Sequence, residues 1–285
     1  MIRRSLPLLA VLAGVLLAWF VAAGAMNYPQ AAEQADEGAP MQEVLAATMA
    51  LDRPLLPAPQ QVGAALWDGL FGYPPNSPRS LVFHAGVTAG AAALGFALAL
   101  AGGMLLALGI VHSRTMDRAL MPWVVASQTV PILAIAPMVV VVLGNVGLVG
   151  LLPKALIAGW LGFFPVAMGM VAGLRAPDRM QRDLMRTYGA SRLQVLAKLR
   201  WPAAMGFLFP SLKVCATLCL VGAIVAELPT GAQAGLGARL LAGSYYGQPM
   251  QIWSALFAAA ALSLLLAGLV GAAQAMVAAR RGGRL

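Results

Sequence analysis

Charge is scarce in this chain. Asp, Glu, Lys and Arg make up only 10% of its 285 residues, whereas hydrophobic residues make up 60%. A soluble domain carries about a quarter charged residues, so a globule of this composition could not cover itself with a hydrated surface. Apolar runs of about 20 residues recur between short charged stretches, long enough for an α-helix to cross about 30 Å of hydrocarbon. The composition therefore predicts an all-α integral membrane protein.

Other absences narrow the chemistry. The only two cysteines, Cys215 and Cys219, lie one helical turn apart in an apolar run, which is typical of small core residues rather than of a disulfide or metal site. No Gly-Lys pair occurs, which excludes the phosphate-binding loop that ends in Gly-Lys-Ser or Gly-Lys-Thr. No nucleophile and base constellation or metal-ligand spacing indicates an enzyme, so we expect no catalytic residue and no bound metal. The 19 basic residues are spread over the hydrophilic breaks, which argues against a nucleic-acid surface.

Six apolar runs are predicted to span the membrane. They cover approximately residues 8–25, 85–110, 119–143, 151–174, 206–226 and 251–278. The first run follows Arg3 and Arg4, and Ala23-Gly24-Ala25 resembles a signal-peptide cleavage site. Its apolar stretch is longer than the roughly 7 to 15 residues of a signal core, which favours a retained helix.

The basic residues indicate the topology of these spans. If the N-terminus is cytoplasmic, 14 of the 19 basic residues lie inside. They are Arg3, Arg4, Arg114, Arg118, Arg175, Arg179, Arg182, Arg186, Arg192, Lys198, Arg200, Arg280, Arg281 and Arg284. Cytoplasmic loops carry the excess of Lys and Arg, so we expect both termini inside. The chain then divides into an N-terminal helix (1–25), an outside segment (26–83), a transmembrane domain (84–280) with an inside loop (175–205), and an inside tail (281–285).

The outside segment is the one long hydrophilic insertion. It is rich in Ala and Pro, and its stretches 41–51 and 62–71 are amphipathic enough to lie at a membrane surface. Two interpretations stay open: a spacer between the first two spans, or a docking surface for an external partner.

The inside loop is predicted to form two short helices. Pro177 and Asp178 open the first, with the acid near the positive end of the helix dipole. Gly189 is expected to end it in a left-handed conformation, and Ser191 to cap a second helix that ends by Pro202. A structured, amphipathic loop of this length indicates docking against a partner, with anionic lipid headgroups as the alternative.

One stretch of this loop follows a known spacing. In that spacing, an acid, two alanines, three variable residues and a glycine are followed, after nine residues, by a hydrophobic, variable, hydrophobic, proline ending. The residues concerned are Asp183, Leu184, Met185, Arg186, Thr187, Tyr188, Gly189 and Ala190, then Leu199, Trp201 and Pro202. This pattern resembles the EAA loop of binding-protein-dependent ABC transporter permeases, with aspartate where glutamate is usual and Leu184-Met185 where an alanine pair is usual. Val130-Pro131, Pro137 and Val225-Ala226-Glu227 extend the resemblance to the nitrate, sulfonate and taurine branch, over roughly residues 55–280.

The resemblance implies a six-helix, MetI-like permease bundle of the bacterial inner membrane. Such permeases work in pairs, so it implies a second copy of this chain or a close paralogue. It also implies an ABC ATPase subunit under each inside loop and a periplasmic solute-binding protein outside. ATP and Mg²⁺ would bind the ATPase, with no cofactor on this chain. The helix from about 178 to 188 would couple the permease to the ATPase, and Gly189 would set the angle between the two short helices.

The implied substrate is a small polar solute such as nitrate, an alkanesulfonate or taurine. A thiamine-precursor pyrimidine or another small heterocycle is the alternative. Both stay open, because the resemblance implies that specificity resides largely in the binding protein.

Five residues are candidates for the translocation path. Gln128 and Thr129 precede Pro131, whose missing N–H leaves a carbonyl available, although ordinary interhelical hydrogen bonds would also explain them. Lys213 lies inside the fifth span and either snorkels to the inside face or attracts an anion. Glu227 either marks the outer end of that span or serves as a gate or binding-protein contact.

Two other classes of protein stay open. A secondary transporter usually has intramembrane acids and often an inverted repeat, and here no acid lies well inside a predicted span. A membrane anchor without transport would not need a structured docking loop.

Overall fold

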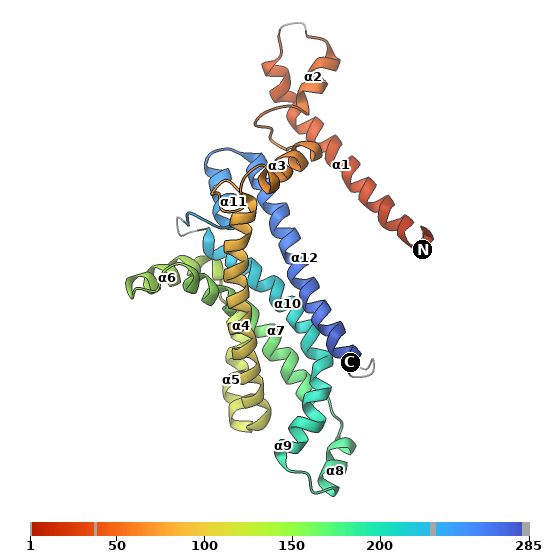
Figure 1. Cartoon of the computed structure of the whole chain (residues 1–285), viewed down its shortest axis with the longest axis vertical. Helices are drawn as coiled ribbons and strands as arrows, with labels where there is room; N and C mark the ends of the chain where they lie inside the picture. The colour runs from red at the N-terminus through yellow and green to blue at the C-terminus, as the bar shows by residue number, and fades with distance from the viewer. Residues whose placement is uncertain (1, 37–38, 229–231, 281–285) are drawn as a thin grey trace. The chain divides into compact units, whose positions relative to one another are not determined.

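The computed structural model describes residues 2–36, 39–228 and 232–280, and every regular element in them is helical. The helices are α1 (Ile2–Gln34), α2 (Met41–Thr48), α3 (Pro59–Phe71), α4 (Leu81–His112), α5 (Arg114–Ala126), α6 (Ile132–Asn145), α7 (Leu151–Arg175), α8 (Arg179–Thr187), α9 (Arg192–Val195), α10 (Trp201–Glu227), α11 (Leu236–Tyr245) and α12 (Pro249–Arg280) (Figure 1). The chain divides into two compact units, one of residues 1–84 and 238–258, the other of 85–237 and 259–285. The predicted inside tail, 281–285, and the side chains of Arg3 and Arg4 lie outside the described residues.

Five of the six predicted spans are confirmed as long apolar helices. The second, fourth and sixth lie in α4, α7 and α12, and the fifth lies in a helical run over 192–227. The first lies in α1, which continues to Gln34 instead of ending near residue 25. This extension has a folded partner, because Ala31 is buried in a cluster with Val44 and Leu51.

The third predicted span is not one continuous helix. A short 3₁₀ turn, Ser127–Thr129, ends the first half, and α6 leaves it at a bend of 101°. The cause is Pro131, because a proline disfavours helical geometry in the residue before it, and Val130 is accordingly extended at φ −71° and ψ 120°. Figure 1 shows α6 turned away from the direction of α5. The run predicted over 119–143 therefore forms a bent pair of helices, which is long and apolar enough to cross a membrane as one broken span.

The segment predicted to lie outside, 26–83, folds against α1. Its two amphipathic stretches form α2 and α3, as expected. Asn27 is fully buried; its amide donates to the carbonyls of Thr48 (3.1 Å) and Leu56 (2.9 Å), and its side-chain oxygen accepts from the Leu56 N–H (3.1 Å). Trp19 Nε1 also donates to the Pro57 carbonyl at 3.0 Å. A segment held at these points has a defined structure, whether it acts as a spacer or as a docking surface.

The core of the second unit is built on the close approach of α7 and α10. A Cβ at Gly173 would lie 2.7 Å from Ala204 Cα, and one at Gly162 would overlap the Cys219 thiol. Small residues let membrane helices approach closely and gain van der Waals contact. Cys215 and Cys219 are both free and fully buried at this interface, which confirms the prediction of small core residues.

Candidate functional site

The predicted helix pair of the inside loop is present and rigidly capped. The Asp178 carboxylate accepts from the Gln181 N–H at 2.7 Å, and the Gln181 side chain accepts in return from the Asp178 N–H at 3.2 Å. Ser191 and Gln194 repeat this reciprocal arrangement at the start of α9. Such capping boxes satisfy backbone donors that a helix leaves unpaired at its first turn. The two short helices therefore carry their own stop and start signals.

Gly189 joins the two helices in the left-handed conformation, with φ at +67°. Its N–H donates to the Arg186 carbonyl at 2.9 Å, and the Ala190 N–H donates to the Met185 carbonyl at 3.0 Å. Glycine is the residue that adopts this conformation at no steric cost. The expected turn is confirmed, and it fixes the angle at which α8 meets α9.

The second short helix is predicted to end by Pro202, but the structure shows no such end. After α9 the chain forms a π-helical turn over Leu196–Arg200 and then enters α10 directly. Pro202 occupies the second position of α10, where a helix tolerates the missing N–H. The loop is thus continuous with the fifth span, in one helical run over 192–227.

Helix α8 has two chemically different faces. Met180, Leu184 and the capping residue Tyr188 follow at intervals of four, and these side chains are 76%, 56% and 79% exposed. Arg179, Arg182 and Arg186 lie on nearly the opposite side, because an α-helix turns about 100° per residue. Exposed apolar residues at this spacing on a rigid helix form a ready surface for a partner.

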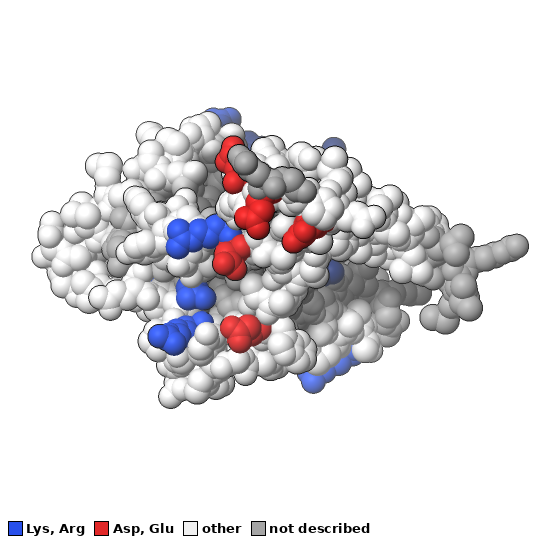
Figure 2. All heavy atoms as spheres, turned by 90° about the horizontal axis from the view of Figure 1, so that it is seen from above, with Lys and Arg blue, Asp and Glu red and all other residues white. Residues whose placement is uncertain are grey.

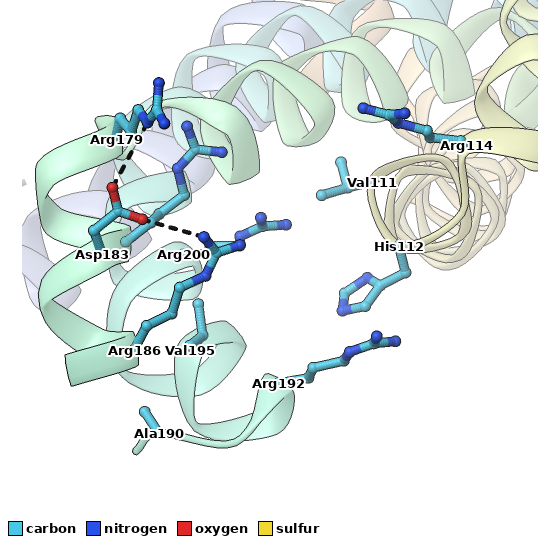
Figure 3. Close-up of a pocket in the computed structure, with 11 residues that line it drawn as sticks. Val111, His112, Arg114, Arg179, Asp183, Arg186, Ala190, Arg192, Val195 and Arg200 are labelled. Carbon is cyan, nitrogen blue, oxygen red and sulfur yellow. Dashed lines mark hydrogen bonds and ion pairs between the residues drawn. The ribbon is translucent and has the colours of Figure 1, made fainter. Parts of the chain in front are cut away.

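The basic face of α8 lines a cleft of about 720 Å³ (Figure 3). The lining residues come from the end of α4, the start of α5, α8 and the α9 region: Val111, His112, Arg114, Arg179, Arg182, Asp183, Arg186, Ala190, Arg192, Val195 and Arg200. Six of these are arginines and one is an acid. Asp183 pairs with Arg186 at 3.2 Å and with Arg179 at 3.7 Å. We call this the arginine cleft.

At the opposite end of α10, Glu227 is buried in a polar cluster. Thr88 Oγ1 lies 3.1 and 3.0 Å from the two carboxylate oxygens, and Lys154 Nζ lies 3.5 Å from Oε1. The Gly237 N–H donates to Oε2 at 2.9 Å, while the Leu236 N–H donates to Thr88 Oγ1 at 2.8 Å. We call these groups the Glu227 cluster. The cluster ties α4, α7 and the start of α11 to the end of α10.

A second cleft, of about 980 Å³, opens beside Lys154. It lies among α4, α6, α7 and residues 232–234, and its described lining is apolar or uncharged except for Lys154. The Lys154 ammonium also donates to the Ala234 carbonyl at 3.2 Å. We call this the Lys154 cleft. A single cation at the edge of an apolar hollow is a typical arrangement for orienting a small ligand.

The predicted path residues are not gathered in one place. Gln128, Thr129 and Pro131 lie exposed at the break before α6, and Thr129 Oγ1 donates to the Ala126 carbonyl at 2.8 Å. Lys213 lies partly buried on α10, facing Gly271 of α12. Glu227 ends α10, as predicted, but inside the cluster just described. Their roles in a path stay predictions.

Sequence reasoning missed two partners of Glu227 and five of the six arginines of the arginine cleft. Thr88 is separated from Glu227 by 139 residues, so its role carried no local signal. Lys154 did carry one, since a lysine near the start of an apolar span is unusual. Of the cleft arginines, only Arg186 belongs to the predicted coupling loop, and the other five entered the sequence analysis through the topology. Among the described residues no group of three His, Cys, Asp or Glu side chains could hold a metal.

Charge is distributed differently on the face seen from above in Figure 2. There, acidic and basic side chains both appear among uncharged atoms. The arginine cleft, by contrast, is surrounded almost entirely by one sign of charge.

Residues 99–282 match the family described as the binding-protein-dependent transport system inner membrane component. The chain belongs to this family. It is therefore an ABC transporter permease, a multi-pass transport subunit with the MetI-like helical fold. The predicted family is thereby confirmed, and the readings as a secondary transporter or a simple anchor lose their support.

Known relatives of this permease carry different substrate names. It is 32% identical over 184 residues to ThiX, a formylaminopyrimidine transport permease protein of Halalkalibacterium halodurans, covering 64% of this chain and 68% of the relative. It is 31% identical over 218 residues to RibX, a riboflavin transport system permease protein of Chloroflexus aurantiacus, covering 76% and 77%. A third relative, named for transport of aliphatic sulfonates, is SsuC of Bacillus subtilis, 25% identical over 163 residues and 57% of each chain.

Proposed function

We propose that two copies of this permease form the translocation path of an ATP-driven importer, with an ABC ATPase seated on each α8–α9 element. The observation that carries this proposal is the exposed apolar stripe of Met180, Leu184 and Tyr188 on a helix capped at its start. A surface of this kind fits an apolar groove on a partner. ATP and Mg²⁺ bind the ATPase, and this chain contributes no catalytic residue and no cofactor.

The proposed orientation places α8 and α9 in the cytoplasm with both termini. Support comes from the concentration of Arg and Lys on that side of the spans. In this orientation the Glu227 cluster and the Lys154 cleft lie toward the periplasm, where a solute-binding protein delivers its cargo. The membrane is the inner membrane of a bacterium.

The proposed substrate is a small nitrogen heterocycle of the pyrimidine class. ThiX and RibX, both named for heterocyclic cargo, are more similar to this chain than SsuC is. The Lys154 cleft supports the same choice, because its mostly apolar lining suits a flat ring and its one ammonium can bind a ring acceptor.

A small anion such as nitrate, taurine or an alkanesulfonate is the second candidate. Lys213 on α10, for which the structure gives no ion pair with a described acid, is the observation that favours it. The two candidates separate in uptake by cells that express the complete importer. Uptake of labelled formylaminopyrimidine that excess taurine does not inhibit would support the heterocycle, and uptake of labelled taurine alone would overturn it.

The ATPase partnership is tested by affinity purification of the permease from gently solubilised native membranes. A stoichiometric ATPase should accompany the chain and should be lost when residues 183–189 are replaced by a flexible linker. Replacing 73–79, a stretch of equal length in the other unit, is the matched control and should leave the ATPase bound. A well-folded chain that never retains an ATPase in several detergents would contradict the proposal.

A further inference from the structure

The arginine cleft and the apolar stripe of α8 are different surfaces. The stripe contains Met180, Leu184 and Tyr188, whereas the cleft is lined by Arg179, Arg182 and Arg186 from nearly the opposite side of the helix. The cleft therefore needs an explanation of its own.

The cleft carries uncompensated positive charge. Six arginines from α5, α8 and the α9 region surround it, and Asp183 is the one acid among its described lining residues. Asp183 lies within ion-pair distance of two of the six, Arg179 and Arg186. Like charges gathered at this density repel one another, so the arrangement is stabilised when an anion enters.

One feature points to a ligand rather than to a solvated charged surface. The arginines converge from separate elements: Figure 3 shows Arg114 beyond the end of α4 on one side of the hollow and Arg186 and Arg200 on the other. Several guanidinium groups that face one hollow are suited to a group with several acceptor oxygens.

The position of the cleft restricts the class of ligand further. Its walls include the end of α4, a membrane-spanning helix, and the residues just before α10, so the cleft lies at the ends of two spans. Phosphate groups of lipid headgroups are concentrated at this depth, and basic pockets between spanning helices bind anionic headgroups. We propose that the arginine cleft binds a phosphate group, supplied by the headgroup of an anionic phospholipid or by a free phosphate.

The test uses the full-length permease with two double variants. Arg114→Gln with Arg192→Gln removes one arginine from each side of the cleft, and the structure gives neither residue an ion pair with a described acid. Arg118→Gln with Arg280→Gln is the matched control, because it removes the same charge from exposed arginines that do not line the cleft. Circular dichroism of each variant checks that its helices are intact.

The lipid arm measures retention of phosphatidylglycerol. Each protein is reconstituted in nanodiscs of phosphatidylcholine mixed with phosphatidylglycerol, released into mild detergent, and examined by native mass spectrometry. Losing one hydrogen bond to a charged group weakens affinity about tenfold, so the cleft variant, which loses two such donors, should retain the lipid about 100-fold more weakly than the control, which loses none from the cleft. The free-phosphate arm titrates lipid-depleted protein with inorganic phosphate at constant ionic strength and follows the thermal unfolding midpoint.

The outcomes distinguish the two sources. Loss of lipid retention in the cleft variant alone, without stabilisation by inorganic phosphate, identifies a headgroup site. Stabilisation of the wild type and control by phosphate, absent from the cleft variant, identifies a site for free phosphate. If the cleft variant and the control behave alike in both arms, the proposal is overturned. Both arms measure binding without the ATPase or the substrate, so a failure of the proposed transport function would not affect them.

Discussion

At one end of α10 a single carboxylate is fully buried among its partners, whereas near the other end six arginines surround an open cleft that contains one aspartate. Glu227 has a hydroxyl, an ammonium and a backbone N–H around its two oxygens. The arginines of the cleft are mostly exposed. They come from the start of α5 and from the α8–α9 region. The same pair of packed helices, α7 and α10, therefore ends in a closed polar cluster on one side and in an exposed, positively charged surface on the other.

The difference indicates what each end does. Buried charges that are paired resist separation, because removing either partner leaves an uncompensated charge in a poorly solvated place. The Glu227 cluster thus holds helices and loop together as one body. The exposed arginines and the exposed apolar stripe are not held by buried partners of this kind, so they are available to a partner and to a phosphate group. Transitions that move packed helices as rigid bodies use this combination of a rigid body and a docking surface.

The largest effect should come from breaking the closed end. Glu227→Ala removes the carboxylate that pairs with the Lys154 ammonium and that accepts the Gly237 N–H. The folded state should lose about 3 to 5 kcal/mol, measured as a lower thermal unfolding midpoint of the purified chain. Adding Lys154→Met should recover part of the loss, since the unpaired charge is then gone. Equal midpoints for wild type and Glu227→Ala would show that the cluster does not hold the helices together.

The next effect should come from the turn at the open end. Gly189→Val places a β-branched residue at φ +67°, which costs about 1 to 2 kcal/mol locally and changes the angle between α8 and α9. Membrane insertion should be unaffected, while uptake and substrate-stimulated ATP hydrolysis should fall sharply. Gly189→Asn is the control, because asparagine tolerates the left-handed region, and should keep most of the uptake. Full uptake by the valine variant would refute the role assigned to this turn.

A smaller effect is expected on the apolar stripe. Leu184→Ser should leave the stability of the isolated chain unchanged, because the side chain is 56% exposed. It should weaken retention of the ATPase about tenfold, because the complex loses the burial of a leucine side chain. Leu45→Ser on α2, where the leucine is 50% exposed, is the matched control. Quantitative pull-down of the ATPase measures both, and equal retention would move the docking surface elsewhere.

The smallest effect should follow from the one acid of the arginine cleft. Asp183→Asn removes two ion pairs whose partners are largely exposed, and exposed pairs contribute about 0.2 to 1 kcal/mol. The unfolding midpoint should therefore shift little, and phosphatidylglycerol retention should rise slightly because the cleft becomes more positive. A loss of ATPase binding as large as that of Leu184→Ser would instead show that Asp183 touches the ATPase.

Local signals in the sequence predicted the open end well. Asp178, Gly189 and Ser191 act on residues within four positions of themselves, so caps and turn could be identified without a tertiary structure. The same reasoning failed at Pro202, where the π-helical turn over Leu196–Arg200 carries the chain into α10. At Pro131 the sequence indicated disrupted helical bonding but not the direction of α6, whose Ala136 is buried in a cluster with Ile157 and Ala226.

The closed end could not have been predicted in the same way. Glu227, Thr88 and Lys154 come from three helices far apart in the chain, and no spacing relates them. Of the three, only Glu227 was singled out by the sequence, as the outer end of a span or a gate. Only the tertiary structure shows that Thr88 and Lys154 are the hydrogen-bond and ion-pair partners of Glu227.

The sequence by itself determined that this protein is a helical membrane protein, because hydrocarbon thickness dictates span length and short-range backbone hydrogen bonding dictates caps and turns. The permease family was indicated by the resemblance of its loop motif. The tertiary structure alone decided which charged side chains are buried in ion pairs, as Glu227 is, and which stay exposed and uncompensated, as most arginines of the cleft do. Those properties depend on distances between residues that are remote along the chain, and burial changes the energy of a charge far more than its neighbours in sequence do.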